Sequence, residues 1–207
     1  MTKKIVQPLK QLNAAAKEIA DGNMDVSIEC NTNDEVKTLT ESIQQMAQNL
    51  KAYVKEINGL VYRDGLTGVK NKMYYSEYIK SLSEEEQKQP YAIVVFKVTG
   101  LAGVNKTRGR KCGDELIVTA CGIICRVFSH SPIFRIGGDE FVAFLKGNDY
   151  MKCGELLREF EDFSSDVTLV SAPDIAVRIV YGTAQSADGT EPYEEVFCRA
   201  DEEMEQK

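Results

Sequence analysis

The chain has 207 residues, which allows one or two domains, and a formal net charge of −7 at pH 7. Its 43% hydrophobic and 28% charged residues are typical of a protein that buries a core, which argues against wholesale disorder. The acidic balance argues against nucleic acid as a partner, and no apolar run approaches the roughly 20 residues that span a bilayer. The single histidine, His130, and the lack of any CxxC pair argue against a zinc site and a Ser/His/Asp hydrolase.

The first sixty residues contain two series of apolar residues spaced alternately three and four positions apart. The first series is Ile5, Leu9, Leu12, Ala16 and Ile19, and the second is Val36, Leu39, Ile43, Met46, Leu50, Tyr53, Ile57 and Leu60. A period of 3.5 predicts two helices whose narrow apolar stripes are buried when two chains lie side by side. For the second series, the alternative is an ordinary amphipathic helix of a single domain. Between them, Met24, Val26 and Ile28 alternate with polar residues and predict an extended connector, and Asn33 or Asp34 can cap the second helix.

This order of helix, connector and helix resembles a HAMP domain over about residues 3–55, with Pro8, Gly22 and the run Asp34-Glu35-Val36 at the expected places. The resemblance implies a parallel four-helix bundle made by two chains, and therefore a homodimer that relays movement from a membrane sensor. Because HAMP domains normally follow a transmembrane helix, it also implies the cytoplasmic part of an inner-membrane receptor, whose membrane segment lies upstream, or a soluble descendant. We assign residues 1–57 to this helical segment with its linker and residues 58–207 to a second domain.

From residue 64 onward the pattern alternates between helices and strands. It predicts helices over residues 72–82, 113–128, 153–163 and 194–206, and strands over residues 91–96, 133–136, 141–145 and 175–184. The run Tyr91–Phe96 is apolar throughout, as in a central strand covered on both faces. Gly137-Gly138-Asp139-Glu140 separates two short strands and predicts a hairpin. The alternation with one hairpin indicates an α+β or α/β fold with a central sheet flanked by helices.

The hairpin turn carries the candidate chemistry. Its two glycines allow a ligand to approach the backbone, and Asp139 and Glu140 present two adjacent carboxylates. A Mg²⁺ ion in a protein usually takes one or two carboxylates together with substrate phosphates. Residue types and spacing alone leave two interpretations open, which are a divalent metal site and a solvated acidic turn.

Four segments spread over residues 62–207 resemble a GGDEF domain, the fold of diguanylate cyclases. The run Arg135-Ile-Gly-Gly-Asp-Glu-Phe-Val142 contains the family motif in full. Asp64-Gly-Leu-Thr-Gly-Val-Lys-Asn-Lys72 and Val104–Leu116 resemble its opening and middle segments, and Arg199-Ala-Asp201 resembles its closing helix. The resemblance implies an α+β domain with a mostly antiparallel central sheet.

The resemblance also implies an activity, which is the joining of two GTP molecules into cyclic di-GMP by a dimer with Mg²⁺ or Mn²⁺. By position, Asp139 would ligate the metal, and Asp139 and Glu140 would be the catalytic acidic residues.

The resemblance also implies that five further positions of this sequence hold the nucleotide. Asn105 and Asp114 would read the guanine edge, whose acceptor and donors suit an amide and a carboxylate. Gly100 and Leu101 would offer backbone N–H groups to phosphate, and Lys207 falls where the last helix contributes a phosphate-binding lysine.

One departure from the family pattern concerns the metal. Lys97 occupies the position of an aspartate that is a direct metal ligand in the family. It is either a harmless lysine at a strand end, or its ammonium pairs with Asp139 or Glu140 and impairs metal binding. The chain is therefore interpreted as a signal-transduction output protein of the diguanylate cyclase family with a degenerate metal site. The alternative is a catalytically inactive GGDEF domain that binds GTP or a partner protein and relays a conformational state.

Overall fold

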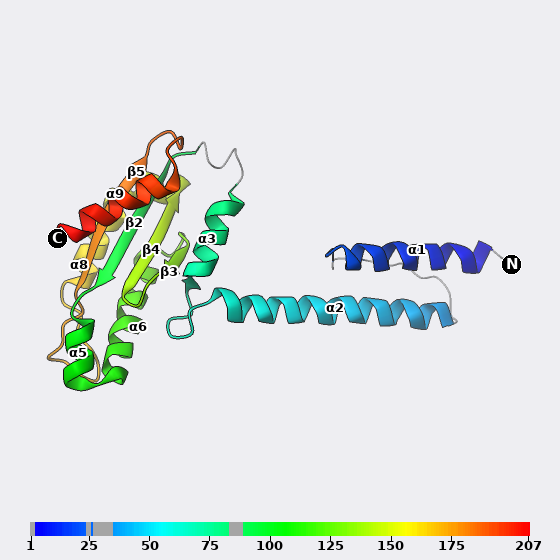
Figure 1. Cartoon of the computed structure of the whole chain (residues 1–207), viewed down its shortest axis with the longest axis horizontal. Coiled ribbons are helices and arrows are strands. Elements are labelled where there is room, and N and C mark those ends of the chain that lie inside the picture. The colour runs from blue at the N-terminus through cyan, green and yellow to red at the C-terminus, as the bar shows by residue number, and fades with distance from the viewer. Residues whose placement is uncertain (1–2, 24–25, 27–34, 83–88) are drawn as a thin grey trace. The chain divides into compact units, whose positions relative to one another are not determined.

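The computed structural model describes residues 3–23, 26, 35–82 and 89–207 (Figure 1). The chain divides into two compact units, Met1–Val61 and Tyr62–Lys207. Met24, Ile28 and the predicted helix cap at Asn33 or Asp34 lie outside the described residues. No helix in the described ranges is both long enough and apolar enough to cross a membrane.

The first unit consists of the helices α1 (Lys3–Ala20) and α2 (Glu35–Tyr62). Among the described side chains of this unit, the buried ones are Leu12, Ala15, Thr40 and Ala47. Most described members of the predicted apolar stripe in α2 remain exposed within a single chain, for example Met46 at 59% and Tyr53 at 62%. One copy of the chain therefore leaves an apolar helix face without cover.

The second unit is built on a five-stranded sheet with the order β1-β3-β4-β2-β5. The strands are β1 (Lys70–Asn71), β2 (Tyr91–Val98), β3 (Ile133–Arg135), β4 (Glu140–Lys146) and β5 (Ile179–Ser186). Only β1 and β3 pair in parallel, and the other neighbours are antiparallel. The prediction of an α+β domain with a mostly antiparallel sheet and a β3–β4 hairpin is confirmed.

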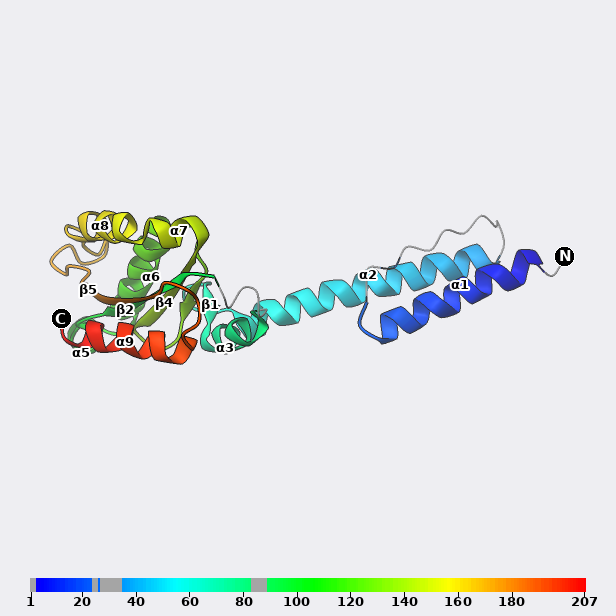
Figure 2. The ribbon, with the colours of Figure 1, turned by 90° about the horizontal axis from the view of Figure 1, so that it is seen from above.

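Six helices complete the described part of this unit. They are α3 (Lys72–Ser81), α5 (Leu101–Arg108), α6 (Arg110–Val127), α7 (Gly147–Met151), α8 (Cys153–Ser164) and α9 (Tyr193–Glu205). Figure 2 shows α6 and α8 on one face of the sheet and α3 and α9 on the other. Strand β2 serves both layers, because Phe96 and its alternate neighbours pack with α6 and α8, whereas Ile93 and Val95 pack with α9.

The structure differs from the predicted elements in several places. The short elements β1, α5 and α7 were not predicted, α6 begins at Arg110 rather than at residue 113, and β5 begins later than predicted. Helix α5 was not predicted, because its two turns are bounded by Gly100 and Gly109, both with positive φ, and carry little apolar pattern. Strand β5 begins at Ile179 rather than at residue 175. Its partner β2 ends opposite Ile179, so the preceding residues hydrogen-bond locally instead, with the Val177 N–H donating to the Val167 carbonyl.

Candidate functional site

The β3–β4 turn holds the two predicted catalytic carboxylates in a closed backbone loop. The N–H groups of Ile136 and Gly137 donate to the Glu140 carbonyl at 3.0 and 3.4 Å. A Cβ on Gly137 would lie 2.8 Å from the Glu140 Oε2 atom. Glycine at this position therefore lets the Glu140 side chain fold back over the turn.

The end of β2 lies against this turn and brings Lys97 to Glu140. The two residues are direct cross-strand partners, and the Lys97 Nζ atom lies 3.4 Å from the Glu140 Oε1 atom. The Val98 N–H donates to the Asp139 carbonyl at 2.8 Å, which fixes the turn to β2. The hydrogen bond to Glu140 and the charge of its carboxylate raise the pKa of Lys97. Lys97 consequently keeps its positive charge at neutral pH, and an ammonium group has no lone pair for a metal.

A half-buried ion pair behind the turn joins it to the opening segment of the domain. The Arg135 Nη1 atom lies 2.8 Å from the Asp64 Oδ1 atom, with side-chain exposures of 13% and 22%. The other guanidinium nitrogen, Nη2, donates to the Gly138 carbonyl inside the turn. Thr67 donates to the same Asp64 oxygen through its backbone N–H at 2.9 Å and its hydroxyl at 2.6 Å. Burial alone would raise the pKa of Asp64, but the hydrogen bonds from Thr67 and Arg135 outweigh it and lower that pKa.

The sequence analysis treated Asp64 and Arg135 only as members of the family motifs. It did not predict that the two residues anchor the β3–β4 turn. The signal available was an aspartate three residues before a threonine, a pattern in which the carboxylate accepts from the backbone of the following turn. The long-range partner in β3 could not be found from the sequence, because 71 positions separate the two residues.

The predicted guanine-reading residues lie on two consecutive helices joined at Gly109. Asn105 is half-buried on α5 and Asp114 is exposed on α6. The Asn105 amide occupies the space beside Gly113, where a Cβ would lie 2.0 Å from its Oδ1 atom. The structure thus packs the Asn105 side chain against the start of the helix that carries Asp114.

The predicted phosphate-contacting residues lie at two different places. Gly100 adopts a left-handed conformation with φ of 81° and precedes Leu101, the first residue of α5. Lys207 follows α9, where its ammonium pairs with Glu203 at 3.0 Å and lies 4.2 Å from the centre of the Tyr181 ring on the edge strand β5. In this structure Lys207 is therefore engaged with its own helix and with β5.

An ammonium group lies beside the carboxylates of the turn. The Glu140 carboxylate is engaged by the Lys97 side chain. Across the described residues, no group of three or more histidine, cysteine, aspartate or glutamate side chains is placed to hold a metal.

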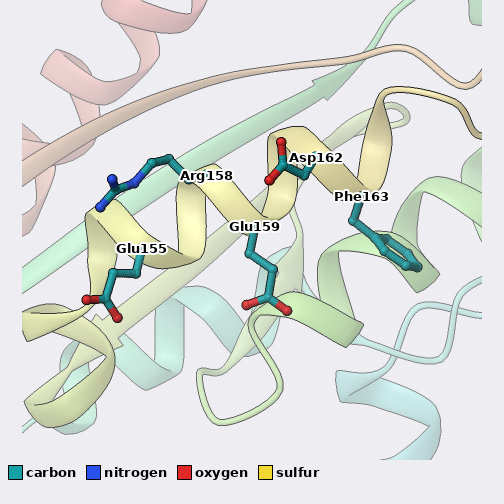
Figure 3. A pocket seen from close by; sticks show the side chains of 5 residues that line it. All are labelled: Glu155, Arg158, Glu159, Asp162 and Phe163. Carbon is teal, nitrogen blue, oxygen red and sulfur yellow. The ribbon is translucent and has the colours of Figure 1, made fainter.

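A separate shallow hollow lies on α8, away from the residues named above. It is lined by Glu155, Arg158, Glu159, Asp162 and Phe163, whose side chains diverge from the helix rather than meeting at one point (Figure 3). Phe163 is covered on one side by the guanidinium of Arg126 at 4.1 Å. This hollow contains none of the predicted site residues.

Comparison with known proteins gives two family matches. The family model described as "Diguanylate cyclase, GGDEF domain" matches residues 61–207, and the HAMP domain model matches residues 1–52. Diguanylate cyclase DgcS of Shewanella oneidensis is 31% identical over 144 residues, which cover 68% of this chain and 47% of that protein. Probable diguanylate cyclase DgcC of Escherichia coli K12 is 22% identical over 160 residues, which cover 76% of this chain and 43% of that protein. The chain thus spans about half the length of these relatives.

Solved structures share the fold at lower sequence identity. The coiled coil and GGDEF domain of DgcB from Caulobacter crescentus superposes with a TM-score of 0.68 at 20% identity, covering 82% of this chain and 92% of that chain. Diguanylate cyclase SiaD from Pseudomonas aeruginosa superposes with a TM-score of 0.62 at 22% identity, covering 97% of this chain and 73% of that chain.

Proposed function

The chain belongs to the GGDEF family of diguanylate cyclases and carries a HAMP domain, and from this we propose that it is the output part of a cyclic di-GMP signalling protein. The proposal is supported by relatives that are named diguanylate cyclases and by the DgcB structure, which was solved with c-di-GMP. The HAMP domain supports a place on the cytoplasmic side, as part of a longer receptor.

We further propose that Lys97 limits cyclase activity. The observation that carries this proposal is the Lys97–Glu140 ion pair, with 3.4 Å between the Nζ and Oε1 atoms. Relative to an aspartate, Lys97 removes one negative charge and adds one positive charge beside Asp139 and Glu140. A divalent ion that bridges nucleotide oxygens needs carboxylate ligands and is repelled by an adjacent ammonium. We propose that the domain binds GTP through Asn105 and Asp114 and converts it slowly.

Substitution of Lys97 tests this proposal. With GTP and Mg²⁺ or Mn²⁺, the Lys97→Asp variant should form cyclic di-GMP at least about 10–100 times faster than the wild-type chain, the range typical of lost metal-site support. Chromatography of the products gives the rate. Lys152→Asp is the matched control, because it makes the same charge change at an exposed position before α8, away from the predicted site residues, and should leave the rate unchanged. Equal rates for the wild type and Lys97→Asp would contradict the proposal.

The same assay distinguishes a slow cyclase from the second candidate function, which is a relay without catalytic activity. That function is favoured by the exposed apolar stripe of α2, through which two chains can transmit a conformational state. It predicts that Lys97→Asp restores Mg²⁺-dependent GTP binding but no product.

We also propose that the chain is a homodimer through α1 and α2, and the stripe of α2 provides a test. Ile43→Asp places one charge per chain in the apolar seam, where an unpaired charge is costly, and should shift the molecule from dimer to monomer. Light scattering at micromolar concentration measures the mass. Gln48→Asp adds the same charge at an exposed position outside the stripe and should leave the dimer intact. A dimeric Ile43→Asp variant would show that the seam does not hold the chains together.

The packing of Asn105 against Gly113 gives a test of the proposed guanine site. Gly113→Ala should push the Asn105 amide aside, because the new Cβ would lie 2.0 Å from its Oδ1 atom. The loss of one hydrogen bond, worth about 1–1.5 kcal/mol, predicts roughly tenfold weaker GTP binding in calorimetry. Gly122→Ala, in the same helix and with no atom within 4 Å of the new Cβ, should bind GTP as the wild type does. Unchanged affinity of Gly113→Ala would remove Asn105 from the proposed site.

A further inference from the structure

Two cysteines of α6 form a dithiol that the proposed nucleotide chemistry does not use. Cys121 and Cys125 are four positions apart, so they lie on the same face of the helix, and their sulfur atoms are 3.9 Å apart. Cys121 is buried, whereas Cys125 is half-buried. Both are free thiols, and a small reagent reaches Cys125 first.

This dithiol is connected to the β3–β4 turn through three side chains. Thr67 is one of the neighbouring side chains that act on the pKa of Cys121, and its hydroxyl donates to the Asp64 carboxylate at 2.6 Å. Asp64 in turn holds Arg135 at 2.8 Å, and Arg135 donates to the Gly138 carbonyl within the turn. A displacement of Cys121 therefore acts on the residues that anchor the turn.

We propose that Cys121 and Cys125 are a reversible thiol–disulfide modification site, and that their oxidation by a low-molecular-weight disulfide loosens the β3–β4 turn. The proposal concerns this chain's own thiols and does not depend on whether the domain turns over GTP.

The two thiols have different roles in this exchange. The hydrogen bond from Cys121 lowers the pKa of Cys125, although burial opposes the shift, and the same contact together with burial raises the pKa of Cys121. The Cys125 thiolate attacks one sulfur of the small disulfide and releases one small thiol. The Cys121 sulfur, after losing its proton to solvent, then attacks Cys125 and releases the second small thiol. The protein loses two hydrogens and two electrons, and the small disulfide is reduced to two thiols.

The bridge changes the helix because the two positions are too far apart for relaxed disulfide geometry. Residues at i and i+4 of a helix have Cβ atoms about 5–6 Å apart, whereas a disulfide needs about 3.5–4.5 Å. Formation of the bond therefore draws this turn of α6 together and moves Cys121 away from Thr67. A strained disulfide is readily reduced, which makes the modification reversible.

Oxidised glutathione and hydrogen exchange test the proposal on the full chain without nucleotide. After incubation and alkylation of the remaining thiols, mass spectrometry of the peptide 112–126 should show a Cys121–Cys125 bond with Cys112 alkylated. The amides of Ile136 and Gly137, which donate to the Glu140 carbonyl, should then exchange at least about tenfold faster, and dithiothreitol should restore their protection.

Two variants serve as comparison. Cys125→Ser should show neither the bridge nor the faster exchange, whereas Cys198→Ser, which removes an exposed thiol of α9, should show both. The oxidised and re-reduced wild-type chains provide the same comparison without any substitution. A stable mixed disulfide at Cys125 with Cys121 still open to alkylation would overturn the proposal. A bridge that leaves the exchange of the turn unchanged would overturn it as well.

Discussion

Replacing Asp64 by asparagine should lower the free energy of unfolding of the GGDEF domain by about 2 kcal/mol. The Arg135 and Asp64 side chains are 13% and 22% exposed, so removal of the counter-ion leaves a partly buried charge without its partner. Loss of one partner of a fully buried ion pair typically costs roughly 3–5 kcal/mol, whereas solvent screens a pair that is partly exposed. Asparagine also retains an oxygen that accepts from Thr67, which places the expectation below this range. Urea unfolding of the wild type and Asp64→Asn measures the difference.

Asp174→Asn is the matched control, because it removes the partner of Arg108 at the surface. That pair has side-chain exposures of 52% and 62%, and exposed pairs contribute about 0–1 kcal/mol. If the two variants lose the same stability, the Asp64–Arg135 pair is not the anchor of the turn.

The stability difference between the wild type and Asp64→Asn should also depend on pH. Asp64 has a folded-state pKa below its ordinary value of 3.8, so its carboxylate stabilises the fold fully at neutral pH. This contribution disappears as the pH falls below 3.8 and through the folded-state pKa. We therefore expect a constant gap above about pH 5 that closes in acid. A gap that widens as the pH falls would contradict the lowered pKa.

Gly182→Ala should destabilise the domain by about 3 kcal/mol or more. Gly182 lies in β5 under α9, where a Cβ would lie 2.0 Å from the Ala200 carbonyl oxygen and 2.4 Å from the Met204 nitrogen. Both atoms belong to the helix backbone, so α9 must move as a whole. Overpacking usually costs about 1–3 kcal/mol, and the rigid neighbours place this site at or above the upper end.

A glycine in open surroundings provides the comparison for Gly182. Gly122 lies on the exposed side of α6 with no atom within 4 Å of a new Cβ. Gly122→Ala should stabilise the helix by about 0.5–1 kcal/mol, because alanine loses less backbone entropy on folding. Thermal unfolding of the two variants should therefore shift in opposite directions. If the thermal unfolding midpoint of Gly182→Ala equals that of the wild type, α9 does not pack on β5 as closely as described.

Much of the fold could be predicted from local pattern. The apolar run of β2 predicts a strand covered on both faces, and the structure buries it between two helical layers. The turn residues Gly137 and Gly138 predict the hairpin that β3 and β4 form. Helix α5 could not be predicted because its eight residues are bounded by glycines and are held by α6 rather than by their own propensity.

Only those site residues that belong to the family motifs could be predicted from the sequence. Lys97 stood out because it replaces an expected carboxylate, but the sequence left open whether it pairs with Asp139 or Glu140. The cross-strand register selects Glu140 as the partner, because it places Lys97 directly opposite Glu140. The Asp64–Arg135 anchor joins residues that are 71 positions apart in the sequence, so only the fold brings them together.

The central claim, that the Lys97 ammonium stands where a divalent ion would bind, is tested most directly by the metal dependence of GTP affinity. Calorimetry of the wild type and Lys97→Asp, each with Mg²⁺ and with a chelator, gives four affinities. The wild type should bind GTP with nearly the same affinity in both conditions. Lys97→Asp should bind at least about tenfold more tightly with Mg²⁺ than without it. A wild-type chain whose GTP affinity depends on Mg²⁺ as strongly as that of Lys97→Asp would contradict the account.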